Sequence, residues 1–210
     1  MLLKPAEQLL ADDVRSFAAG AELTGPSLRG AMQNAVSAGI SELLESDGEE
    51  IGEDLAQTLE ESKARKQAFV AAARALLEPG GPLSTPPPAG IGFDEYLRRS
   101  APAVAQALAE RLGVGAECKS RGIDGLLAIK SVRMWAGAAA SLAWARFEGR
   151  APRADDAGET LHAVTAAAAA ETFVTGDAQP LAWLPRAAFA GLQITDLKGF
   201  LAATQPPSAD

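Results

Sequence analysis

The hydrophobic positions along most of the chain recur with the spacing of an α-helix. Residues 5–19 place Leu9, Leu10, Val14 and Phe17 on one face, and Gly20 follows them. The same pattern predicts helices over 26–46, 53–77, 93–113, 125–147 and 157–170, with 93–113 forming one or two of them. Residues 125–147 are apolar on more than one side, so this helix is expected at the centre of the core.

Two short β-rich runs lie near the end of the chain. They are TFVTG at 172–176 and LQIT at 192–195, and a closing helical turn is expected at 197–204. Strands that alternate with helices favour an α/β fold with a small, mostly parallel sheet. The fold should be rich in helix, because residues 26–113 supply several helices and no convincing strand.

Composition narrows the class of protein. The formal net charge of −8 has the wrong sign for holding nucleic acid by broad neutralisation of phosphates. It still allows an enzyme whose carboxylates meet phosphate through bound cations. The single cysteine, Cys118 in the loop-like ECKSRG, rules out an intrachain disulfide and a cysteine metal cage. With no evident signal peptide or membrane span, we expect a cytoplasmic protein that does not bind membranes.

Common cofactor and nucleophile motifs are absent from the sequence. There is neither a GxxxxGK[ST] phosphate loop nor a GxGxxG between a strand and a helix. A serine or cysteine hydrolase would have to use His162, the only histidine, and no nucleophile signature accompanies it.

Carboxylates gather around the last predicted helix and the strand after it. Asp155 and Asp156 precede the helix that carries Glu159, and Asp177 follows the strand, at the edge where α/β sheets bind ligands. The alanines at 166–170 would let the helix lie close to the sheet, which brings Glu159 near Asp177. Such a group can hold Mg²⁺ or Mn²⁺. Equally, Asp155 and Asp156 can cap the helix, and Glu159 suits its first turn.

The stretch from 153 to 201 resembles the C-terminal half of a PIN domain, a three-layer α/β/α nuclease. The matching elements are DAGETLH at 156–162, the alanine run, FVTGD at 173–177 and LQI at 192–194. The resemblance implies that Asp177 and either Asp156 or Glu159 bind metal, and that Thr175 supports the site by hydrogen bonding. The family more often has Asp where this chain has Glu159.

The N-terminus departs from that pattern, because a PIN domain opens on an apolar strand that ends in Asp. Here residues 2–5, followed by Leu9 and then Asp12 and Asp13, resemble the family's second strand and the helix with its second acid. Asp12 or Asp13 would then be a metal ligand, and the first strand would be missing. Either the real start lies upstream, or the domain is cut down and inactive. Asp12 and Asp13 can equally be exposed helix charges.

These observations lead to one expected function and one alternative. Residues 1–210 would form one PIN-like domain, with a helical insertion at 26–113 that contains a Pro/Gly-rich loop at 83–92. The resemblance implies a Mg²⁺- or Mn²⁺-dependent endoribonuclease acting on RNA, with an antitoxin or other protein as partner. The alternative is a non-catalytic helical interaction module, whose helices pack on each other or on a second copy in a homodimer and whose carboxylates are caps.

Overall fold

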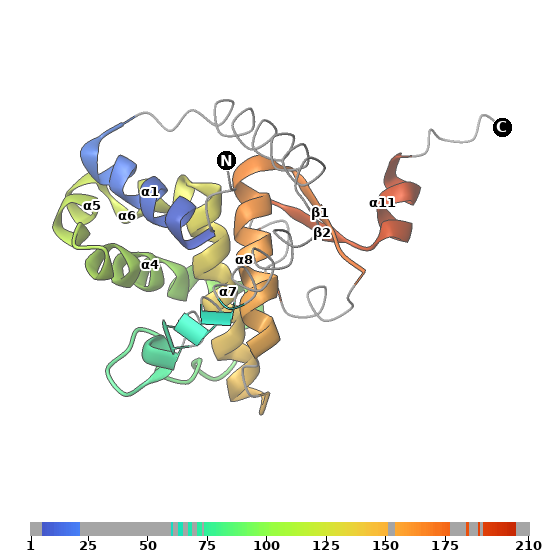
Figure 1. The fold of residues 1–210 in the computed structure, drawn as a ribbon. Coiled ribbons are helices and arrows are strands. Elements are labelled where there is room, and N and C mark those ends of the chain that lie inside the picture. Colours follow the sequence, from blue (N-terminus) through green and yellow to red (C-terminus); the bar gives the residue numbers. More distant parts are fainter. Residues whose placement is uncertain are drawn as a thin grey trace.

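The computed structural model describes residues 6–21, 60, 63–64, 67–68, 71–72, 74–150, 154–176, 184, 189 and 191–204. Helices form most of this part of the chain, and two short strands form a parallel sheet (Figure 1). The expected helix-rich fold with a small parallel sheet is therefore confirmed. The third layer and the extent of the insertion stay predictions, because much of 1–59 lies outside the described residues.

The elements follow one another as α1 (Ala6–Ala19), α4 (Phe93–Arg111), α5 (Gly115–Arg121), α6 (Ile123–Ala128), α7 (Lys130–Phe147), α8 (Ala154–Ala169), β1 (Thr172–Val174), β2 (Gln193–Thr195) and α11 (Leu197–Thr204). The described residues between 60 and 77 are also helical, in agreement with the helix predicted over 53–77. The helix predicted over 26–46 lies outside the described residues.

Helix α7 is the centre of the core, as its apolar pattern predicted. Side chains are buried on every side of it, among them Val132, Met134 and Leu142. Runs of alanine such as 138–140 let α4 and α8 approach closely, because a methyl side chain takes little space. Helices α4 and α8 pack against α7 along its length, and α1 closes one end of the bundle (Figure 1).

The region between α4 and α7 differs from the sequence prediction. The segment that contains Cys118 is the helix α5 rather than a loop, and a break at Ile129 separates α6 from α7. Gly113 (φ +75°) ends α4 and Gly122 (φ +93°) separates α5 from α6. Both glycines adopt left-handed backbone conformations that other residues rarely reach. Cys118 itself is fully buried and contacts α1, where its Sγ lies 4.0 Å from the carbonyl oxygen of Val14.

The C-terminal part forms the parallel unit that the sequence predicted. After α8 the chain enters β1, which pairs with β2 in the register Thr172 to Gln193 and Val174 to Thr195. The backbone N–H of Thr175 then donates to the carbonyl oxygen of Thr195, which extends the pairing by one residue. Helix α11 follows β2 directly as a helix of two turns, and Figure 1 shows it set apart from the helical bundle.

Candidate acidic site

Asp156 is held in the protein interior by an ion pair. Helix α8 begins at Ala154, so Asp156 lies in its first turn rather than before it, which corrects the sequence prediction. Its side chain is 1% exposed, and Arg150 donates to Oδ1 at 2.5 Å. The carboxylate is therefore neutralised by the segment that leads into α8. The sequence signal for this pair is an arginine shortly before an acidic helix start.

Asp13 takes part in a different contact, between α1 and α7. The hydroxyl of Ser131 in the first turn of α7 donates to its carboxylate. Burial raises the pKa of Asp13, Asp12 adds to the rise, and the hydrogen bond from Ser131 opposes it. The N-cap residue of α7, Ile129, offers no side-chain cap, so Asp13 places a carboxylate at the positive end of the central helix.

Asp13 and Asp156 lie at opposite ends of the α7–α8 pair. Helices α7 and α8 are antiparallel neighbours (Figure 1), and Trp135 and Val164 line the same pocket between them. Asp156 lies eight residues before Val164, and Ser131 lies four residues before Trp135 in the opposite direction. At 1.5 Å per residue, the two carboxylates are separated by about 18 Å along the helix axes. They cannot bind one metal ion, whose oxygen ligands lie within about 2.6 Å of it.

Glu159 lies in the second turn of α8, and Thr175 follows β1, the next element along the chain. Strand β1 contacts α8, and Figure 1 shows it leading diagonally away from the upper end of the helix. Glu159 and Thr175 are each half-buried. Because Arg150 engages Asp156, Glu159 is the better candidate of the two α8 acids for a site that includes the end of the strand.

The remaining predicted site residues are only partly described. Asp177 lies outside the described residues, as does the side chain of Asp155. His162 is exposed on α8, and Arg146 is exposed in the last turn of α7. Within the described ranges no three acidic, histidine or cysteine side chains lie close enough to hold a metal ion. A metal site at this place would therefore need ligands from beyond these ranges, such as Asp177.

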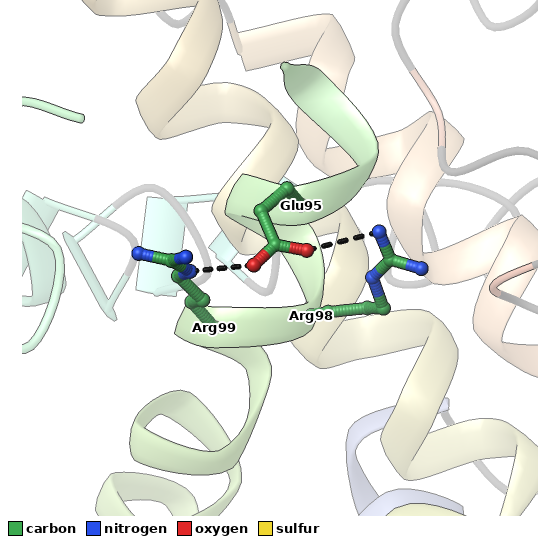
Figure 2. Close-up of polar contacts among 3 residues, drawn as sticks. All are labelled: Glu95, Arg98 and Arg99. Carbon is green, nitrogen blue, oxygen red and sulfur yellow. Dashed lines mark hydrogen bonds and ion pairs between the residues drawn. The ribbon is translucent and has the colours of Figure 1, made fainter. Parts of the chain in front are cut away.

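Exposed arginines of α4 are engaged by a carboxylate on the same helix. Glu95 accepts hydrogen bonds from Arg99 at 2.7 Å and from Arg98 at 2.9 Å, as Figure 2 shows. The hydrogen bond from Arg99 is the main cause of the lowered pKa of Glu95. Because each arginine already has an anionic partner, this face of α4 is a weak surface for the phosphates of RNA.

Comparison with known proteins finds no relative: no family model, no curated protein and no solved structure matches the chain. In the described part of the chain, none of the helices combines the length and the hydrophobicity needed to cross a bilayer.

Proposed function

We propose that the chain is a metal-dependent endoribonuclease of the PIN type, with Glu159, Thr175 and Asp177 at its site. The observation that carries the proposal is that β1, which contacts α8, leads at its carboxyl end to Thr175, while Arg150 already engages the other α8 carboxylate, Asp156. Asp177 follows Thr175 by two residues at that end. Asp13 and its neighbour Asp12 lie at the other end of α8 and are not part of the proposed site. Asp156 has a structural role instead.

The donor atoms suit Mg²⁺ or Mn²⁺, since two carboxylates and a hydroxyl supply only oxygen. Such a cation, when bound, lowers the pKa of water and neutralises the phosphodiester. The protein would contribute the two carboxylates that hold it, Glu159 and Asp177. Thr175 would orient Asp177 by hydrogen bonding, since its backbone is fixed by the bond to Thr195. The exposed Arg146, in the last turn of α7, would contact an RNA phosphate.

A cleavage assay with end-labelled single-stranded RNA and Mn²⁺ tests this function. We expect cleavage that EDTA abolishes and that falls at least ~100-fold in Glu159→Gln and in Asp177→Asn. Glu171→Gln is the matched control, since it removes an exposed carboxylate between α8 and β1 and should keep full activity. Equal cleavage by all three variants would refute the assignment of the site, and a folded wild-type chain that cleaves no RNA would refute the function.

A non-catalytic interaction module is the second candidate, and one observation favours it. Leu197 and Leu201 of α11 are 61% and 49% exposed, and Val174 of β1 is 38% exposed. Exposed apolar side chains are common at protein–protein interfaces. An antitoxin-like partner or a second copy of the chain would cover these side chains. Size-exclusion chromatography with light scattering distinguishes a dimer from a monomer, and Leu201→Glu should dissociate such a dimer.

A further inference from the structure

A pocket of about 270 Å³ lies between α1, α4, α7 and α8. Its walls are mainly apolar side chains from all four helices, including Leu10, Leu108, Trp135, Leu161 and Val164. Alanines at 68 and 72 border the same space and leave it open, because their side chains are short. The pocket is separate from the acidic residues proposed for RNA cleavage, none of which lines it.

The volume of the pocket limits the size of its ligand. At roughly 30 Å³ for each water, the pocket holds about nine waters or a ligand of a similar number of non-hydrogen atoms. Aliphatic and aromatic walls favour an apolar ligand over ordered water, which would need several polar partners.

Two opposite charges stand at the edge of this apolar space. Glu7 lies in the first turn of α1 and Arg111 in the last turn of α4, and they are the charged residues among the described ones that line the pocket. No ion pair joins them in the described part of the chain, and Oε1 of Glu7 is buried with no hydrogen-bond donor. A buried carboxylate oxygen without a donor is unfavourable, so a ligand that donates a hydrogen bond at this position would be favoured.

We propose that this pocket binds a free α-amino acid with an apolar side chain, of the size of leucine. The ammonium group would donate to Glu7, the carboxylate would accept from Arg111, and the side chain would lie against Trp135 and its apolar neighbours. A fatty acid would leave the oxygen of Glu7 without a donor, and an alkylamine would leave Arg111 without an anion. Only a ligand with both charges and an apolar body satisfies the whole lining.

Calorimetry with the full chain and L-leucine tests the proposal. We expect saturable binding with a Kd on the order of 1 mM or tighter, the range for so small a ligand. Glu7→Gln and Arg111→Gln should each weaken binding at least about tenfold. Glu117→Gln and Lys119→Gln remove exposed charges on α5 and should leave the affinity unchanged. Circular dichroism verifies that each variant is folded.

Ala107→Leu provides a test that leaves both charges in place. Residue 107 lines the pocket, so the added atoms should occupy the ligand volume and abolish binding without loss of the fold. The proposal is overturned if the folded wild-type chain shows no saturable binding of L-leucine. It is also overturned if octanoate or octylamine binds as tightly as leucine, or if both charge variants keep the wild-type affinity.

Discussion

The guanidinium of Arg150 lies 2.5 Å from the carboxylate of Asp156, and the Asp156 side chain is 1% exposed. A negative charge at the start of α8 is thus retained inside the protein, because a cation from the preceding segment neutralises it. The hydroxyl of Thr160 donates to the backbone carbonyl of Asp156 one turn below, which fixes the same turn of helix. Asp156 therefore contributes to stability at the start of α8.

Breaking this pair should destabilise the protein. Arg150→Met removes the cation that pairs with the buried Asp156 carboxylate, and we expect a loss of about 3–5 kcal/mol in the free energy of unfolding. The double variant Arg150→Met with Asp156→Leu should recover most of the loss, because neither side chain then carries a buried charge. Urea unfolding of the single and double variants measures both effects. A single variant as stable as the wild type would show that Asp156 does not depend on Arg150.

Asp13 should make stability depend on pH in a direction set by its raised pKa. The folded protein keeps the proton on Asp13 to a higher pH than the unfolded chain, whose reference pKa is 3.8. The stability that the folded protein gains from this proton is therefore fully present below pH 3.8, and it is lost as the pH rises through the pKa of Asp13 in the folded state.

Urea unfolding as a function of pH measures this contribution. The stability of the wild type relative to Asp13→Asn should decrease as the pH rises above 3.8. Asp124→Asn, which removes an exposed charge in the first turn of α6, is the control and should not show the same trend. A wild type that gains stability relative to Asp13→Asn over this range would contradict the raised pKa.

Gly20 should tolerate substitution less well than Gly80. Both have positive φ angles, +77° and +90°, so alanine strains the backbone at each by roughly 1 kcal/mol. A Cβ at Gly20 would also lie 2.7 Å from Nη1 of Arg121, whereas nothing lies within 4 Å of one at Gly80. Arg121 is fixed there because its Nε donates to the carbonyl oxygen of Ala18 at 2.9 Å.

Thermal or urea unfolding of the two alanine variants measures the difference. Displacing Arg121 removes its hydrogen bond to the end of α1, so Gly20→Ala should cost about 1 kcal/mol more than Gly80→Ala. Equal losses in the two variants would mean that Arg121 does not secure the end of α1.

Replacing a leucine by alanine should change the stability of the protein much more in the core than on α11. Leu126 of α6 is fully buried, and Leu126→Ala should cost about 2–5 kcal/mol through lost burial and the cavity left behind. Leu197 is 61% exposed, and Leu197→Ala should change stability by no more than about 0.5 kcal/mol. Chemical unfolding tests both at low protein concentration. A large loss for Leu197→Ala would indicate that α11 is covered by a partner chain.

Periodicity predicted the helices well because most of them bury one clear face. Residues 5–19, 93–113 and 157–170 correspond closely to α1, α4 and α8, and the two parallel strands lie where their β-branched and aromatic residues predicted them. The short helix α5 was not predicted, because its exposed residues are mostly charged and only Cys118 and Gly115 are buried. Local pattern carries little information for a helix of seven residues that depends on contacts with α1 and α4.

Distances between carboxylates were harder to predict than the elements that carry them. The sequence gives no direct measure of how α1 is placed on α7 and α8, and this placement is what separates Asp13 from Asp156. Nor does an acidic residue at a helix start reveal whether a cation such as Arg150 will neutralise it. Glu7 and Arg111 lie far apart in the sequence, so no local motif could have indicated the pocket that they share.

Titration of the chain with Mn²⁺ by calorimetry tests the proposed metal site most directly. We predict saturable binding that Glu159→Gln and Asp177→Asn each abolish, and that Asp13→Asn leaves unchanged because Asp13 lies at the far end of α8. A folded chain that binds no Mn²⁺, or that binds it equally well without Glu159 and Asp177, would contradict a metal-dependent nuclease site at the end of β1.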